Sequence, residues 1–289
     1  MRVLSIQSQV IYGHVGNNAG VFPLQRNGID VWAVPTGVLA FNPSYGPPAH
    51  RPTAPEEMDA WIAALQTRPE WTQIDAVLLG WLGSPSTAEA AGRAALAVKK
   101  ANPNAIFLCD PVMGDTDSGL YVDPTLPAYI RDTLFPTADI ATPNGFELEY
   151  LTGGRIETLP QALAACDALR AKGPSTVVAT TLKRTDGGRD KGGQPLLEAL
   201  LVNREGAWLC AVPDLGEGLP KGAGDLFASL FLTRLLKGRT AKKALLFAMS
   251  ATYTALRDAR ESHAPEMRLE VIQDLLRAPQ FLPDIERVR

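Results

Sequence analysis

The sequence is poor in cysteine, and its cysteines do not form a paired motif. Cys109, Cys166 and Cys210 are the only three among 289 residues, and they are far apart in the chain. Without a CxxC pair, neither a zinc ribbon nor a disulfide framework is indicated. Unpaired thiols fit a reducing compartment.

Long hydrophobic runs and an excess of charge of one sign are also missing. No stretch approaches the roughly 20 apolar residues of a membrane-spanning helix, and no basic leader precedes the first apolar run. The 28 basic and 31 acidic residues nearly balance, giving a net charge of −3. This balance argues against a nucleic-acid or membrane partner. We therefore expect a cytoplasmic protein.

Several catalytic signatures are absent. The chain has no G-x-x-x-x-G-K-[ST] phosphate loop, no G-x-G-x-x-G after its first apolar run, no G-x-S-x-G and no H-E-x-x-H. These absences disfavour P-loop nucleotidases, dinucleotide-binding enzymes, α/β-hydrolases and zinc peptidases of the familiar type.

Short apolar runs instead alternate with longer segments of helical periodicity. The short runs predict strands at residues 3–7, 30–34, 76–79, 105–108, 139–141 and 176–179, and a hairpin at 196–203 and 207–212. The periodic segments predict helices near 17–27, 56–67, 86–100, 144–151, 159–171, 223–237, 240–258 and 268–277. This alternation predicts a parallel sheet covered by helices on both faces, in one domain spanning residues 1–289.

Two segments lack periodicity. Residues 36–55 contain five prolines, which suggests a functional surface loop. Residues 184–195 combine glycines with charges, which suits a mobile lid. Each could equally be a tolerated polar excursion.

The tetrapeptide Gly222-Ala223-Gly224-Asp225 directly precedes an apolar helical run. Backbone N–H groups at a helix start have no partner inside the helix, and glycine lets an anion approach them closely. Asp225 in the first turn could orient a substrate hydroxyl and accept its proton. The alternative is a glycine-rich helix start whose aspartate only favours the helix dipole.

Two further polar clusters follow predicted strands. Asp110 and Asp115 flank a turn with Pro111 and Gly114, where two carboxylates could face hydrated Mg²⁺ or could simply cap the turn. The stretch from Thr142 to Glu147 could cap the next helix or contact metal-bound water and phosphate. Ligands of open α/β sheets bind beyond the carboxyl ends of strands, where both clusters fall.

These three clusters occur in a fixed order after the stretch from Ile6 to Asn17, and this combination resembles the pyridoxal kinases of the ribokinase superfamily. The likeness runs from Val3 to the C-terminal helices and includes Phe22–Gln25 and Leu79–Gly83. The resemblance implies a ribokinase-like α/β fold with a mostly parallel sheet. It also implies transfer of the γ-phosphoryl group of ATP to the 5′-hydroxyl of pyridoxal, and a homodimer.

The resemblance also implies residue roles. Asp225 would be the catalytic base, and Gly222, Ala223 and Gly224 would form the anion hole. The ATP and Mg²⁺ site would comprise Asp110, Asp115, Thr142, Asn144, Glu147, Thr180, Thr181, Cys210, Ala211, Val212 and Pro213. Within this set, Asp110, Asp115 and Glu147 would hold Mg²⁺ through water, beside a monovalent cation such as K⁺. The substrate pocket would comprise Ser8, Val15, Pro43, Ser44, Trp81 and Asp225.

The sequence departs from the family pattern on the vitamin side. Gln9 stands where histidine is usual, Trp81 where tyrosine is common, and Pro43 where a hydroxyl side chain is expected. These departures leave the expectation of ATP use unaffected, but they keep two alternatives open. One is a related kinase for another small hydroxymethyl substrate, such as hydroxymethylpyrimidine. The other is a non-catalytic vitamin- or nucleotide-binding protein of the same fold.

Overall fold

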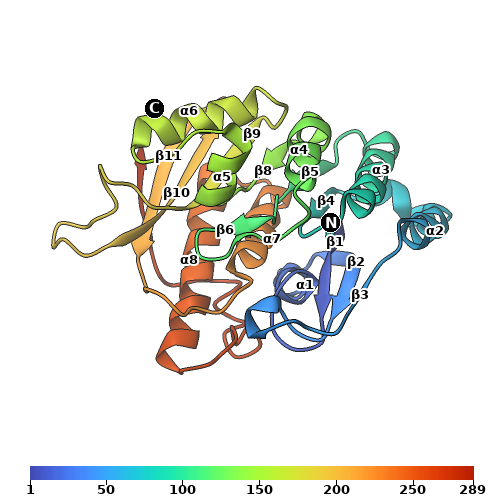
Figure 1. The fold of residues 1–289 in the computed structure, drawn as a ribbon, viewed down its shortest axis with the longest axis horizontal. Coiled ribbons are helices and arrows are strands. Elements are labelled where there is room, and N and C mark those ends of the chain that lie inside the picture. The colour runs from blue at the N-terminus through green and yellow to red at the C-terminus, as the bar shows by residue number, and fades with distance from the viewer.

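A ten-stranded sheet runs through the protein in the order β12-β11-β10-β9-β8-β5-β4-β1-β2-β3 (Figure 1). The structure is a computed structural model and describes residues 1–289. Six neighbouring strands are parallel: β1 (Arg2–Val10), β2 (Asp30–Leu39), β4 (Ala76–Leu79), β5 (Ile106–Cys109), β8 (Ile140–Ala141) and β9 (Thr176–Leu182). Antiparallel strands complete both edges: β3 (His50–Pro52) on one side, and β10 (Leu196–Asn203), β11 (Gly206–Pro213) and β12 (Asp284–Arg287) on the other.

Helices cover both faces of this sheet (Figure 1). One layer contains α1 (Asn17–Arg26), α7 (Ala223–Leu236) and α8 (Ala241–Glu261). The other contains α2 (Pro55–Gln66), α3 (Pro85–Ala101), α4 (Leu126–Tyr129), α5 (Gly145–Thr152) and α6 (Leu159–Arg170). A separate two-stranded ribbon, β6 (Gly114–Asp115) with β7 (Gly119–Leu120), lies beyond β5. None of the helices has both the length and the apolar character needed to cross a bilayer.

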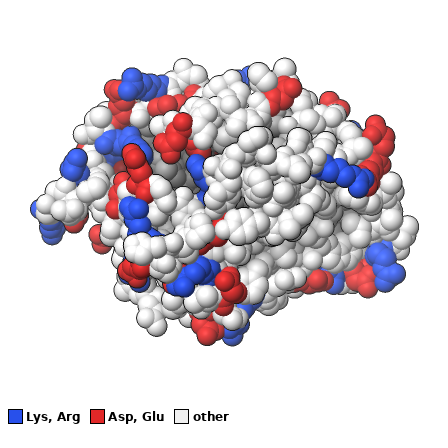
Figure 2. Space-filling model, turned by 60° about the horizontal axis from the view of Figure 1, so that its bottom comes forward, with Lys and Arg blue, Asp and Glu red and all other residues white.

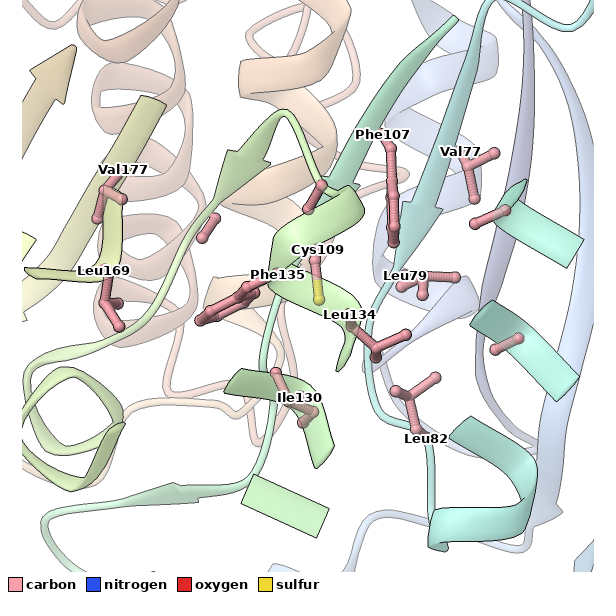
Figure 3. Close-up of a cluster of buried hydrophobic side chains, with 14 of the residues drawn as sticks. Val77, Leu79, Leu82, Phe107, Cys109, Ile130, Leu134, Phe135, Leu169 and Val177 are labelled. Carbon is pink, nitrogen blue, oxygen red and sulfur yellow. The ribbon is translucent and has the colours of Figure 1, made fainter. Parts of the chain in front are cut away.

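The central strands are apolar on both sides because helices cover both faces of the sheet. In β4, Val77 and Leu79 point into the core under α2–α6, whereas Leu78 points into the core under α1, α7 and α8. Phe107 and Cys109 of β5 lie beside Val77 and Leu79 in the first of these cores (Figure 3). Successive residues therefore enter different cores, as the two-residue period of a strand requires.

The predicted elements are confirmed up to residue 261. Their ends shift by at most three residues, except that β2 runs five residues further than predicted. The predicted helix at 268–277 is wrong. That segment forms separate turns, with hydrogen bonds such as Leu275 N to Ile272 O and Arg277 N to Asp274 O. The apolar residues are spaced as in a helix because each packs separately into the core beside α7 and α8. These residues are Leu269, Ile272 and Leu276. Here tertiary packing overrides local periodicity.

The proline-rich stretch at 36–55 is more ordered than a plain loop. Its first residues extend β2, and residues 50–52 return as β3 in antiparallel pairing with residues 37–39. Only the tip between them, including a short 3₁₀ turn at Pro43–Tyr45, is irregular. Proline is tolerated in β3 because this is an edge strand, whose outer N–H groups have no partner to lose.

The two-core arrangement predicts that stability depends strongly on the β5 side chains. Phe107→Ala should lower the free energy of unfolding by about 3–5 kcal/mol, because it removes a fully buried ring. The matched control is Leu96→Ala on α3, where the side chain is 49% exposed and the loss should stay below about 1 kcal/mol. Equilibrium urea unfolding measures both values, and equal losses would contradict this account of the core.

Candidate active site

The predicted polar clusters meet at the carboxyl edge of the sheet. Asp110 follows β5 and Thr142 follows β8, and the start of α7 approaches the same edge from the other helix layer. A methyl group placed on Gly224 would lie 4.0 Å from Oδ2 of Asp110. Segments more than a hundred residues apart in the chain thus enclose one site.

The start of α7 has the geometry of an anion site. Gly222 adopts φ 93°, and a Cβ atom there would lie 1.8 Å from the carbonyl oxygen of His14. Glycine is therefore required both by the left-handed backbone and by the close approach. The N–H groups of Ala223 and Gly224 that follow have no acceptor within the protein. They are free to bind an anion, and the helix dipole favours one.

Asp225 lies in the first turn of α7 and is only 8% exposed. Its Oδ2 accepts a hydrogen bond of 2.9 Å from the N–H of Gly16, whereas its buried Oδ1 has no partner. Burial raises the pKa of Asp225 to about 6, and the bond from Gly16 opposes part of this rise. A buried carboxylate oxygen without a partner is costly, so its retention points to a ligand.

Asp110 and Glu147 are also buried beside Asp225. Burial raises the pKa of Asp110, and the nearby charges of Glu147 and Asp225 raise it further. The hydroxyl of Thr142 donates to Oδ1 of Asp110 at 2.9 Å, which partly offsets the rise, and Oδ2 has no hydrogen-bond partner in the protein. Three carboxylates gathered in one buried region make it favourable to bind a cation there.

Asn144 and Glu147 form the start of α5, so their capping role is confirmed. The side chain of Asn144 accepts from the N–H of Glu147 at 2.9 Å, and Glu147 accepts from the N–H of Asn144 at 2.8 Å. The other oxygen of Glu147 accepts from the N–H of Met113 at 2.9 Å, and Asn144 donates to the carbonyl of Gly114 at 2.8 Å. These four bonds fix the turn after β5 against the start of α5. Burial raises the pKa of Glu147 although nearby backbone N–H groups, including those of Asn144 and Met113, lower it.

Asp115 has a different environment from the other three acids. Lys221 donates to its Oδ2 at 2.9 Å, and the N–H groups of Asp117 and Ser118 donate to its Oδ1. Partial burial would raise the pKa of Asp115, but the bonds from Lys221 and Ser118 outweigh it and lower the pKa. The only feature of the sequence that marks Lys221 is its position directly before Gly222. The structure makes it the one basic side chain in contact with these acids.

The residues predicted to bind the nucleotide divide into two groups. Thr180 lies beside the acid cluster, since its N–H donates to the carbonyl of Pro143 at 2.9 Å. Thr181 has φ 53°, which is rare for a β-branched residue, at the place where the pairing of β9 with β10 shifts register. By contrast, the side chains of Cys210 and Val212 point into the core beneath α8, while Ala211 is half-buried and Pro213 is exposed.

The residues predicted for the vitamin pocket lie around β1, β2 and β4. Ser8 is buried against Gly16, where a Cβ atom would lie 2.4 Å from the Ser8 hydroxyl. The half-buried ring of Trp81 lies close to both Gly37 and Gly83. Val15 is half-buried, and Pro43 and Ser44 are exposed in the tip between β2 and β3. Gln9 stands at the position where histidine is usual in the family. Its side-chain amide is not free, because it donates to Oδ1 of Asn18 at 2.6 Å.

The predicted lid at 184–195 projects from the body at the left of Figure 1. Arg184 lies where this segment leaves the body, and only 5% of its side chain is exposed. It donates two hydrogen bonds to Glu198, of 2.7 and 3.0 Å, which fix this end of the segment. A cavity of about 560 Å³ lies beside this ion pair and is lined in part by Ala211 and Asp284. In Figure 2 charged side chains gather on this side, whereas the centre of the face carries few. Movement of the lid stays a prediction.

Sequence reasoning missed two further parts of the site. Gly16 supplies the N–H that holds Asp225, and only the run of small residues near it hinted at a close approach. Glu266 lies in a segment with no motif, yet its buried carboxylate accepts hydrogen bonds from two loops of the site. No local signal could have identified it, since its partners are more than 200 residues away in the chain.

Fold and site together define a kinase of the ribokinase-like class, and the relatives of the chain agree. The family model described as phosphomethylpyrimidine kinase matches residues 23–267. The chain is 42% identical to pyridoxal kinase PdxY of Rubrobacter xylanophilus, covering 100% of this chain and 98% of that protein. It is also 42% identical to pyridoxal kinase PdxY of Deinococcus radiodurans, covering 99% and 96% of the two chains.

Among solved structures, the pyridoxal kinase of Leishmania donovani in complex with ADP and pyridoxamine superposes with a TM-score of 0.90. The two chains are 28% identical, and the match covers 100% of this chain and 99% of the other. The chain belongs to the pyridoxal kinases, within the phosphomethylpyrimidine kinase family.

The raised pKa of Asp225 predicts a pH-dependent stability. The folded protein holds this proton more tightly than the unfolded chain, whose pKa is near 4. The free energy of unfolding should therefore fall as pH rises from about 4 through 6, by up to about 3 kcal/mol. Asp225→Asn lacks this titration, so its stability should fall less over the same range. Urea unfolding between pH 4 and 7 measures both proteins, and parallel curves would contradict the burial argument.

The contact of Gly222 with His14 predicts a sharp sensitivity at this position. Gly222→Ala should lower kcat/KM by about 100-fold or more, because its methyl group must displace the His14 carbonyl and shift the start of α7. Gly218→Ala is the matched control, since Gly218 also has a positive φ of 73° but open space around it. Steady-state kinetics of the two variants test the geometry. Equal activity would show that the close approach has no role.

Proposed function

We propose that this protein transfers the γ-phosphoryl group of ATP to the 5′-hydroxyl of pyridoxal and releases pyridoxal 5′-phosphate. One observation carries the proposal. Asp225 presents a buried carboxylate oxygen without a partner in the same helical turn as the free N–H groups of Ala223 and Gly224. A proton acceptor for an alcohol thus lies beside donors for the charge of the transferred phosphoryl group.

The environment of Asp225 suits this role. Gly16 holds Oδ2, which leaves Oδ1 to accept the hydrogen bond of the substrate hydroxyl. With a pKa of about 6, the carboxylate is mostly ionised at neutral pH and can take up the proton as the new bond forms. Phosphoryl transfer passes through a loose transition state, so orientation and charge stabilisation supply most of the catalysis. The N–H groups at the start of α7 would stabilise the developing charge.

The acid cluster fits a magnesium ion held largely by water and phosphate. No three acidic, histidine or cysteine side chains converge as a metal cage, and Mg²⁺ is commonly held by one or two carboxylates together with water and substrate phosphates. Asp110 has a free Oδ2, whereas both oxygens of Glu147 are held by backbone N–H groups and Asp115 is paired with Lys221. Asp110 would therefore be the nearest ligand, with the other two acting through water. When bound, the ion would neutralise phosphate charge. The K⁺ site stays a prediction.

The nucleotide would lie across the same edge of the sheet. Since the side chains of Cys210 and Val212 are in the core, this segment would contact adenine through its backbone and through Ala211 and Pro213. Thr180 and Thr181 would lie near the phosphates, where the strained backbone of Thr181 re-aims the strand end. Closure of the 184–195 segment would exclude water from the reaction.

Pyridoxal is the acceptor that the relatives favour, because those 42% identical are named pyridoxal kinases. The flat ring of Trp81 offers a stacking surface for a pyridine. Hydroxymethylpyrimidine is the second candidate, since the matching family model carries the name phosphomethylpyrimidine kinase.

We also propose that the protein works in the cytoplasm as a homodimer. Its three cysteines are free and buried, which fits a reducing compartment. Exposed apolar side chains at the rim of the vitamin side, including Ile11, Tyr12 and Tyr45, would suit contact with a second copy.

The decisive variant is Asp225→Asn, which keeps the shape of the side chain but removes its basicity. We expect kcat to fall by about two to four powers of ten, while pyridoxal still binds. The matched control is Asp274→Asn, an exposed acid in an ion pair with Arg26, whose activity should be unchanged. A coupled ADP-release assay with pyridoxal, pyridoxine, pyridoxamine and hydroxymethylpyrimidine measures both the rate and the acceptor.

Two results would count against the proposal. Near-wild-type turnover in Asp225→Asn would remove this residue from the chemistry. Turnover of hydroxymethylpyrimidine without any turnover of the B6 vitamers would reject pyridoxal as the substrate.

A further inference from the structure

A buried carboxylate outside the acid cluster joins the C-terminal part of the chain to two loops of the site. Glu266 is 8% exposed, and its Oε2 accepts from the N–H of His14 at 3.0 Å. Its Oε1 accepts from the amide of Asn42 at 3.3 Å and from the hydroxyl of Tyr45 at 2.7 Å. No lysine or arginine pairs with it, so three neutral donors from two separate loops hold the carboxylate.

The first of these loops leads to the proton acceptor. The N–H of His14 is held by Glu266, and the carbonyl of His14 packs against Gly222 at the start of α7. Two residues later, the N–H of Gly16 donates to Asp225. The stretch from Gly13 to Gly16 is therefore fixed at one end by Glu266 and at the other by the catalytic helix. A shift at His14 would displace the donor that orients Asp225.

The second loop contains the tip between β2 and β3. Asn42 donates to Glu266 with its amide nitrogen, while its Oδ1 accepts from the N–H of Ser44 at 3.0 Å and caps the 3₁₀ turn. Tyr45 donates to both Glu266 and the carbonyl of Pro265. The positions of Pro43 and Ser44 between these two residues thus depend on the same carboxylate.

The hydrogen bonds at this position require a carboxylate, with an acceptor oxygen on each side. Burying a carboxylate carries a large desolvation cost, which neutral donors offset only in part. A glutamine cannot replace it, because the two oxygens of Glu266 accept on both sides and an amide has one acceptor. Its NH₂ group would face either the N–H of His14 or the amide of Asn42. Asn42 cannot adapt by flipping, since its oxygen is already bound to Ser44.

We propose that Glu266 is a positioning residue for the alcohol side of the reaction, which sets both the 42–45 tip and the loop that holds Asp225. This inference rests on the proposed function for its kinetic test and adds a residue for which no motif or predicted role exists. Because Glu266 lies on the vitamin side, its loss should affect the acceptor alcohol far more than ATP.

The test is steady-state kinetics of Glu266→Gln with each substrate varied in turn. We expect kcat/KM for pyridoxal to fall by about 10- to 100-fold, as misplaced catalytic groups commonly cause, with the KM for ATP changed by less than about twofold. Equal increases in the KM values of both substrates, or no change in either, would overturn the proposal.

Asp258→Asn is the matched control, because it loosens the same segment without touching either loop. Asp258 holds Arg268, two residues after Glu266, through bonds of 2.8 and 3.0 Å. This variant should lose thermal stability but keep its kinetic constants. If it reproduces the pyridoxal defect of Glu266→Gln, general loosening of the segment explains the effect and the specific role fails.

Tyr45→Phe keeps the inference testable if Glu266→Gln does not fold. It removes one donor to Glu266 at an exposed position, so folding should be preserved. We expect a rise of about three- to tenfold in the KM for pyridoxal, equivalent to roughly one hydrogen bond. Where Glu266→Gln does fold, adding Tyr45→Phe to it should have little further effect. A wild-type KM for pyridoxal in Tyr45→Phe alone would contradict the proposal, and so would full additivity in a folded double variant.

Hydrogen exchange separates this inference from the proposed function. Glu266→Gln should speed amide exchange in residues 10–16 and 40–46, whereas Asp258→Asn should not. If the wild-type protein phosphorylates no alcohol, the proposed function fails, and the exchange result alone decides whether Glu266 orders both loops. Unchanged exchange would refute it.

Discussion

Burial of the Asp225 carboxylate at the tip of α7 is the constraint around which the rest of the site is arranged. A carboxylate in this position needs a donor, which Gly16 supplies, and it leaves one oxygen without a partner. Gly16 can approach only because the loop before it packs its His14 carbonyl against Gly222. The helix start, the N-terminal loop and the acid therefore form one unit. A change in any of them changes the geometry of the others.

The same burial explains why the acids of the site differ so much in their ionisation. Asp110, Glu147 and Asp225 are buried in one region, and desolvation raises the pKa of each. Asp115, only partly buried and paired with Lys221, has a lowered pKa instead. A fold selected only for stability would not bury several carboxylates together. The proposed function accounts for this arrangement, because a bound cation would compensate the charges of the carboxylates and of the phosphate groups.

Some parts of the site could be read from local sequence because their determinants are local. A glycine-rich tetrapeptide before an apolar run indicates a helix start, and Asn144 with Glu147 three residues later indicates a capping box. Their positions after β5 and β8 followed from the parallel sheet. Other parts had no local determinant. Glu266 gains its role from partners 221 to 252 residues away, and the periodicity after residue 268 predicted a helix that packing replaced by turns.

The sequence by itself determined the layered α/β architecture and the three polar clusters, because strand and helix periodicity and turn chemistry act over a few residues. It could not determine which oxygens are free. Tertiary structure alone decided that Glu147 is occupied by backbone N–H groups and that Asp225 keeps one oxygen open. It also decided that Cys210 faces the core. Which oxygens are free and which side chains face the core depend on how segments distant in the sequence approach one another. Desolvation and the competition between hydrogen-bond partners are decided only when these segments pack together.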